Sequence, residues 1–186
     1  MLDDNARKQL LKIARLTVEE YVKNGVLPQL KEPSDPQLLE HRGAFVTLTK
    51  QGALRGCIGT FFADKPLYLV VRDMAKAAAT EDPRFAPVVA EEIPELDIEI
   101  SALTPLRTIK DPEEIEVGRH GIYIIQGPYR GVLLPQVATE YGWNKWEFLD
   151  QTCWKAGLNP GCWKDPQTTI KVFEAEVFDE KELGLK

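Results

Sequence analysis

The chain has 186 residues, of which 44% are apolar, and its 29 acidic residues outnumber its 23 basic ones. The resulting net charge of −6 argues against a general nucleic-acid binder, because phosphate backbones are bound by basic faces. No apolar run approaches the roughly 18 residues of a membrane span, and the first residues lack the apolar core of a signal peptide. We therefore expect a single cytoplasmic domain over residues 1–186, with no membrane attachment.

The cysteines and histidines are few. Cys57, Cys153 and Cys162 have no C-x-x-C spacing, and the histidines are His41 and His120. Such a set is untypical of a disulfide framework and supplies few ligands for a metal ion. We therefore predict no disulfide, metal or cofactor, and a reducing compartment. Cys153 and Cys162 are expected to be structural residues.

In chain order, the first predicted element is a helix over residues 4–24, where apolar side chains recur at helical spacing. Three prolines interrupt residues 27–43, which predicts a surface connection. Residues 44–49 and 53–61, joined by Lys-Gln-Gly, have the pattern of a β-hairpin. Residues 64–80 follow as a second helix, whose wide apolar face predicts burial.

In the second half of the chain, predicted helices and strands again follow one another. A short helix is expected near residues 87–93, and residues 96–103 alternate apolar and polar side chains as a strand. A second hairpin is predicted over residues 121–135, a helix over 144–156 and a last strand over 169–178. Because the strands pair through short turns, the sequence predicts an α+β fold with a largely antiparallel sheet flanked by helices.

Six segments, in this order, resemble the AMMECR-type domain family: LRGCIGT, EDPRFAP, IEIS, GRHGIYI, GVLLPQVA and WEFLDQTCWKAGL. The resemblance covers nearly the whole chain and implies two unequal α+β subdomains with a cleft between them, close to LRGCIG. The activity of the family is not established. Association with a Memo-like protein and a radical S-adenosylmethionine enzyme suggests a modification pathway. A role in RNA or nucleotide biology rests on fold analogy alone.

Cys57 is the candidate nucleophile in LRGCIG, because a thiolate attacks electrophilic carbon readily. Arg55 would share its strand face and favour the thiolate, and amides beside Gly56 and Gly59 would hold an oxyanion. The alternative is a small buried side chain in a sheet, since free cysteine is among the most buried residue types. The segment lacks the spacing of the common nucleotide-phosphate loops.

His120 is the candidate general base, because an unperturbed imidazole titrates near neutrality. Its structural alternative is a ring that caps a turn. Glu99 and Ser101 should lie on the strand face opposite Ile98 and Ile100, which is either exposed to solvent or the floor of a cleft. In a cleft, Glu99 would orient His120 or bind a substrate amine.

Three further interpretations concern binding. Arg84 would clamp a substrate carboxylate or phosphate, or else pair only with Asp82 in its own loop. Gln136 would bind the polar edge of a ligand, or else cap the helix that follows. Acidic neighbours favour packing over base stacking for the four tryptophans, Trp143, Trp146, Trp154 and Trp163.

Three functions remain open at this point. The first is a cysteine-dependent enzyme that acts on a small molecule or a modified substrate at Cys57. The second is a non-catalytic module that binds a ligand or a partner such as the Memo-like protein. The third is RNA or nucleotide binding, which the acidity of the chain makes the weakest.

Overall fold

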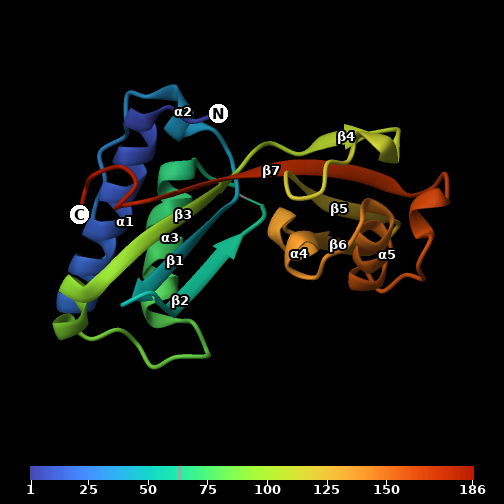
Figure 1. Cartoon of the computed structure of the whole chain (residues 1–186). Coiled ribbons are helices and arrows are strands. Elements are labelled where there is room, and N and C mark those ends of the chain that lie inside the picture. The colour runs from blue at the N-terminus through green and yellow to red at the C-terminus, as the bar shows by residue number, and fades with distance from the viewer. Residues whose placement is uncertain (63) are drawn as a thin grey trace. The chain divides into compact units, whose positions relative to one another are not determined.

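The computed structural model describes residues 1–62 and 64–186, which form two compact units of unequal size (Figure 1). Unit 1 comprises Met1–Leu103 and Glu176–Lys186, and unit 2 comprises Thr104–Ala175. The long strand β7 (Thr169–Asp179) begins in unit 2 and ends in unit 1. The predicted α+β class and the two unequal subdomains are therefore confirmed, whereas the expected cleft stays a prediction.

Unit 1 is built on three antiparallel strands, β1 (Ala44–Lys50), β2 (Ala53–Thr60) and β3 (Leu96–Leu103), with β1 in the middle. The hairpin of β1 and β2 turns at Gln51 and Gly52, which both have positive φ, as favoured two-residue hairpin turns require. The predicted hairpin and the predicted strand over residues 96–103 are both present.

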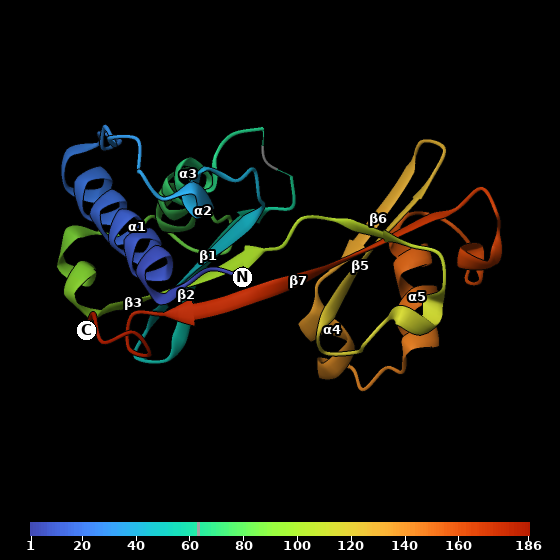
Figure 2. The same cartoon turned by 90° about the horizontal axis from the view of Figure 1, so that it is seen from above.

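Two helices cover one face of this sheet, α1 (Asp4–Asn24) and α3 (Leu67–Thr80), which pack against each other (Figure 2). The helix α1 has the predicted bounds because the Asp3 carboxylate accepts a hydrogen bond from an N–H of its first turn, and Gly25 ends it in the left-handed conformation. The core lies between these helices and the inward-facing aliphatic side chains of the sheet.

Short helices were the least accurately predicted part of unit 1. The connection expected over residues 27–43 contains α2 (Pro36–Leu39), which starts where the Asp35 carboxylate accepts the Gln37 N–H and which buries Leu38. The short helix expected near residues 87–93 is a 3₁₀ helix, η1 (Ala90–Glu95). Proline at the first helical position explains why a proline-rich stretch can still start a helix.

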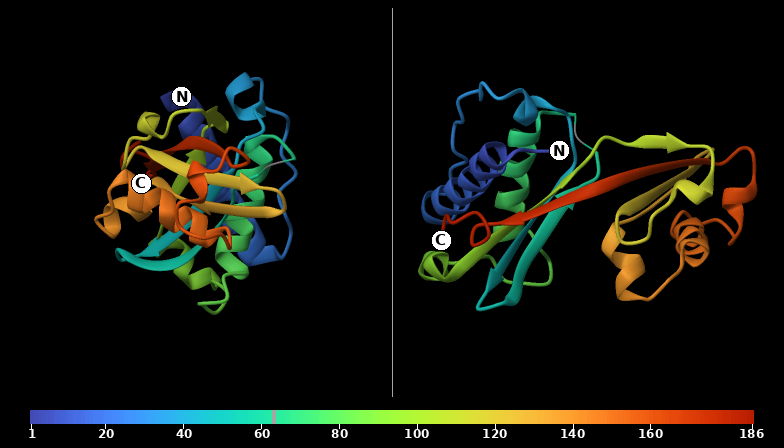
Figure 3. Two further views of the ribbon diagram at one scale, coloured as in Figure 1. Left: turned by 90° about the vertical axis from the view of Figure 1, so that its right-hand side faces the viewer. Right: turned by 45° about the horizontal axis from the view of Figure 1, so that its top comes forward.

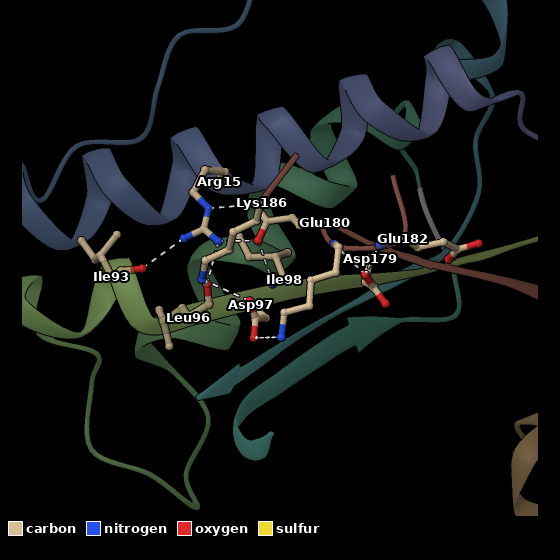
Figure 4. Close-up of polar contacts among 10 residues, drawn as sticks. Arg15, Ile93, Leu96, Asp97, Ile98, Asp179, Glu180, Glu182 and Lys186 are labelled. Carbon is tan, nitrogen blue, oxygen red and sulfur yellow. Dashed lines mark hydrogen bonds and ion pairs between the residues drawn. The ribbon is translucent and has the colours of Figure 1, made fainter. Parts of the chain in front are cut away.

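The last residues of unit 1 are fixed by an ion pair whose carboxylate is buried (Figure 4). Arg15 reaches from α1 to Glu180, whose side chain is 5% exposed, and also donates to the carbonyl oxygens of Ile93 and Leu96. A second, buried pair joins Arg42 to Glu176, with 2.6 Å between Nη2 and Oε1. Both pairs tie the end of the chain to elements distant in sequence.

Unit 2 has the antiparallel order β4-β7-β5-β6, with β4 (Arg107–Ile109), β5 (His120–Gln126) and β6 (Tyr129–Leu133) (Figure 3). The helix α5 (Lys145–Lys155) packs on the β5–β6 hairpin, and α4 (Pro135–Glu140) precedes it. The sequence did not predict β4 or α4, nor the 3₁₀ turns η2 (Pro112–Glu114) and η3 (Cys162–Lys164).

Two expectations for unit 2 are wrong. Cys153 and Cys162 form a disulfide, because the loop after α5 folds back and places the two Cα atoms 5.9 Å apart. Trp154 and Trp146 are 73% and 38% exposed rather than packed inside, because they point away from the buried face of α5. Trp163 does pack against the smaller core.

Candidate functional site

Cys57 lies in the middle of β2 as a free, half-buried thiol. It stands opposite Thr47 of β1, whose Oγ1 is 3.2 Å from the Cys57 sulfur. Thr47 in turn stands opposite Glu99 of β3, so the three residues form one row across the sheet. Their neighbour Gly56 faces α3. Because successive side chains alternate between faces, the row lies on the face that α1 and α3 leave uncovered.

The backbone of Cys57 is held by the loop after α3. The buried Asp82 carboxylate accepts the Cys57 N–H at 2.9 Å, and Arg84 Nη2 lies 3.4 Å from the Cys57 carbonyl oxygen. Arg84 also donates to Asp82 through Nε and Nη2, at 2.9 and 2.7 Å. These hydrogen bonds, first those of Arg84 and then that of Cys57, hold the pKa of Asp82 far below its usual range against the opposing effect of burial.

Arg84 thus forms the ion pair with Asp82 that was considered as the alternative to substrate binding, yet its side chain remains 54% exposed. A guanidinium that binds a carboxylate with one edge keeps donors for a second anion. Its role in substrate binding stays a prediction.

The Arg55 guanidinium, predicted to favour the Cys57 thiolate, is paired with the Glu92 carboxylate. Its Nε and Nη2 bind the two carboxylate oxygens of Glu92 at 3.0 and 2.8 Å, and Nη1 donates to the Ala86 carbonyl oxygen. The Arg55 hydrogen bonds lower the pKa of Glu92 to about 2. Such bidentate pairs are rigid, so the guanidinium links β2 to the segment that carries η1.

The glycines of the segment have close neighbours. A Cβ atom on Gly56 would lie 2.1 Å from the carbonyl oxygen of Ala78 in α3, and one on Gly59 would lie 2.2 Å from the Phe45 ring. The absence of side chains at these two glycines therefore lets α3 and an aromatic ring approach β2. The Cys57 N–H between them already donates to Asp82. Oxyanion binding by amides beside these glycines stays a prediction.

Glu99 and Ser101 occupy the predicted face of β3. Ser101 stands opposite Phe45 and is 9% exposed, whereas Glu99 is half-buried. Burial, together with the negative charge of Asp179, raises the pKa of Glu99 above its ordinary value. A carboxyl group of this kind holds a proton more readily and is suited to donate it.

His120 and Gln136 belong to unit 2, whereas the other predicted site residues belong to unit 1. The buried His120 ring caps a turn, because its Nδ1 accepts the Glu116 N–H at 3.1 Å. The neutral ring therefore carries its proton on Nε2, which lies 3.8 Å from Glu174. Burial first, and the nearby Arg119 next, lower the pKa of His120. Gln136 is exposed on α4.

Two pockets of unit 1 are lined by residues outside this row. Within residues 1–62 and 64–186, no group of three or more histidine, cysteine, aspartate or glutamate side chains is arranged to hold a metal ion. No helix there has the length and apolar character needed to cross a membrane. A pocket of about 430 Å³ lies beside Arg15 and Glu180, but these two charges already bind each other.

Comparison with known proteins places the chain in a family. The AMMECR1 family model matches residues 11–178. The chain belongs to the AMMECR1 family. It is 49% identical to a protein of Thermococcus gammatolerans, with 92% of this chain and 89% of the relative covered. It is 43% identical to a protein of Methanosarcina barkeri, with 98% and 94% covered.

A solved relative has the same fold. The crystal structure of the uncharacterized protein PH0010 from Pyrococcus horikoshii matches with a TM-score of 0.74 and 45% identity, over 93% of this chain and 90% of that one. The AMMECR1 membership confirms the resemblance carried by the six sequence segments. The family has no established function, so the chemistry has to be argued from the residues.

Proposed function

We propose that this AMMECR1-family protein is a cysteine-dependent enzyme that acts on a small molecule at the Cys57–Thr47–Glu99 row. The observation that carries the proposal is the half-buried Cys57 thiol beside the Thr47 hydroxyl at 3.2 Å, on the sheet face opposite α1 and α3. A hydroxyl at this distance can donate a hydrogen bond to the sulfur, whose thiolate is the nucleophilic form.

The other residues of the row have complementary roles. The Cys57 sulfur forms a bond to an electrophilic carbon, and its own proton passes to solvent. The bond from that carbon to the leaving group breaks, and the leaving group takes a proton from Glu99, whose raised pKa suits a proton donor. Water then attacks the same carbon, the bond to the Cys57 sulfur breaks, the released thiolate takes up the proton that the water loses, and Glu99 regains a proton from solvent. The exposed edge of Arg84 binds an anionic group of the substrate.

The remaining predicted residues have weaker support. Ser101 and the glycines line the same strands, whereas Arg55 is committed to Glu92. His120 offers a protonated Nε2 rather than a free base. The pathway with a Memo-like protein and a radical S-adenosylmethionine enzyme, and the cytoplasmic location, rest on the sequence alone.

The test is the rate at which iodoacetamide labels Cys57 as a function of pH, resolved by mass spectrometry. We expect native Cys57 to react faster at neutral pH than the same residue in the urea-unfolded chain. Thr47→Val should slow the native reaction about tenfold by removing the hydroxyl, and Thr47→Ser, which keeps it, should not. Labelling that begins only on unfolding would show that Cys57 is a packing residue.

The second candidate is a non-catalytic adaptor, favoured by the internal pairing of Arg55 with Glu92 and of Arg84 with Asp82, which makes this surface rigid without a ligand. An adaptor would bind the Memo-like protein equally well after Cys57→Ser and more weakly after Arg84→Ala. Binding that is lost only with Cys57→Ser would favour the enzyme. RNA binding remains the weakest candidate because of the net charge of −6.

A further inference from the structure

The disulfide of unit 2 joins two cysteines in unlike surroundings. Cys153 lies on the inner face of α5 and is completely buried among apolar side chains. Cys162 begins the 3₁₀ turn η3 and is partly exposed. Of the two cysteines, Cys162 is therefore the one that offers surface to a reagent in solution.

The loop that carries Cys162 is held in place by contacts that do not involve sulfur. Asp150 Oδ1 accepts the Gly161 N–H at 2.7 Å and the indole N–H of Trp163 at 2.8 Å. The Trp163 ring stacks on Trp146 with ring centroids 5.2 Å apart, and Thr168 Oγ1 donates to the Cys162 carbonyl oxygen at 2.7 Å. These contacts would keep the two sulfurs close even when both are thiols.

We propose that Cys153 and Cys162 form a reversible thiol–disulfide site that exchanges with small disulfides and thiols of the glutathione class, with Cys162 as the point of entry and Cys153 as the resolving cysteine. The Cys162 thiolate attacks one sulfur of the small disulfide, so that a mixed disulfide forms at Cys162 and one small thiolate leaves. The Cys153 thiolate then attacks the Cys162 sulfur and displaces the second small thiolate. Two protein thiols are oxidised, one small disulfide is reduced, and the two protons pass to the released thiolates.

The loop geometry also determines how far this exchange proceeds. The two cysteines are nine positions apart. Closing this loop in the unfolded chain costs conformational entropy, whereas the folded loop already holds the two cysteines together. The difference corresponds to about 100-fold in the equilibrium constant for disulfide formation. The equilibrium constant for forming this disulfide with oxidised glutathione should therefore be about 100-fold larger in the folded protein than in the urea-unfolded chain.

The experiment traps the intermediate in two matched variants. Each carries Cys57→Ser, so that no third thiol reacts, and is fully reduced, freed of reductant and exposed to oxidised glutathione. We expect Cys153→Ser to accumulate a glutathione adduct at Cys162, and Cys162→Ser to remain at least about tenfold less modified because Cys153 is buried. The parent with both cysteines should lose two hydrogens and keep no adduct, as read by intact mass.

Circular dichroism verifies that both variants fold. If one does not, the reduced parent is treated briefly with N-ethylmaleimide, and Cys162 should react before Cys153. Equal adducts in both variants, equal alkylation of the two cysteines, or a parent that stays a dithiol in oxidised glutathione would overturn the proposal. These outcomes do not depend on the reactivity of Cys57, so they test this site separately from the proposed enzyme.

Discussion

The backbone N–H of Cys57 donates to the carboxylate of Asp82, 25 positions later, at 2.9 Å. The bond lies on the outer edge of β2, where an antiparallel neighbour would otherwise pair. Arg84 completes the arrangement from the same loop by reaching toward the Cys57 carbonyl oxygen. The loop thus caps an edge strand and fixes the position of the thiol. The hallmark LRGCIG and the segment EDPRFAP form one structural unit.

The first prediction concerns Gly56, which the α3 backbone approaches too closely for any side chain. We expect Gly56→Ala to lower the free energy of unfolding by about 3 kcal/mol, because neither the strand nor the helix can move without losing hydrogen bonds. Gly59→Ala is the matched comparison and should cost less: the Phe45 ring can turn aside, and the nearest backbone atom, the Ala44 carbonyl oxygen, would lie 2.7 Å from the new Cβ rather than 2.1 Å. Urea unfolding measures both, and equal costs would contradict the packing role of Gly56.

The second prediction concerns the acid stability that Arg55 and Glu92 provide. The pKa of Glu92 falls from an ordinary 4.5 to about 2 in the folded protein. Its contribution to stability is therefore complete above pH 4.5 and is lost as the pH falls toward 2, because the unfolded state binds the proton first. Wild type should be more stable than Glu92→Gln at pH 6, and the difference should shrink by pH 2.5. Thermal melts across this range test it; a constant difference would exclude the ionised pair.

Sequence patterns predicted the long elements and missed what depends on contacts distant in sequence. The apolar stripe and caps of α1 are local, so its bounds are as predicted. The pairing of Thr47 with Cys57 could not be obtained in the same way. Counting back from the turn pairs Thr47 with Gly56, and a β-bulge between Leu48 and Thr49 shifts the register by one. Thr47 was therefore missing from the predicted site.

The disulfide shows a second limit of sequence reasoning. Cys153 and Cys162 are separated by a Gly-containing loop whose course depends on Asp150, and nothing in their spacing indicates that the chain turns back on itself. His120 is a third case, since its neighbours in the sequence left open both a ring that caps a turn and a general base, and the turn-capping bond is seen only in the structure. Family resemblance identified the fold and the segment, and only the structure identified the neighbours of each side chain.

The third prediction uses the buried ring of His120. Its pKa lies below the ordinary 6.5, so the folded state binds fewer protons than the unfolded state as the pH falls below about 6.5, and stability is lost in that direction. Arg119 and Arg107 oppose protonation, whereas Glu116 and Glu174 favour it. We expect wild type to lose more stability than His120→Asn between pH 7 and pH 5, because asparagine keeps an acceptor near the Nδ1 position and does not titrate. Parallel losses in thermal melts would exclude the ring as the titrating group.

The fourth prediction concerns Glu180, whose carboxylate binds Arg15 and accepts the Ile98 N–H at 3.0 Å. Glu180→Gln leaves the partly buried Arg15 guanidinium without its counter-charge, so we expect a loss of about 2 kcal/mol in the free energy of unfolding, between the values for exposed and for fully buried pairs. Lys181→Met is the control, because its ion pair with Asp97 has a lysine side chain 65% exposed and should contribute little.

The double variant Arg15→Met with Glu180→Gln separates the two parts of that loss. Removing both charges leaves no unpaired ion, so part of the stability should return relative to Glu180→Gln alone. Urea unfolding of wild type, Arg15→Met, Glu180→Gln and the double variant gives the interaction energy directly. If Glu180→Gln were as stable as Lys181→Met, the C-terminal segment would be held by its apolar contacts, and the ion pair would be a consequence of that packing rather than its cause.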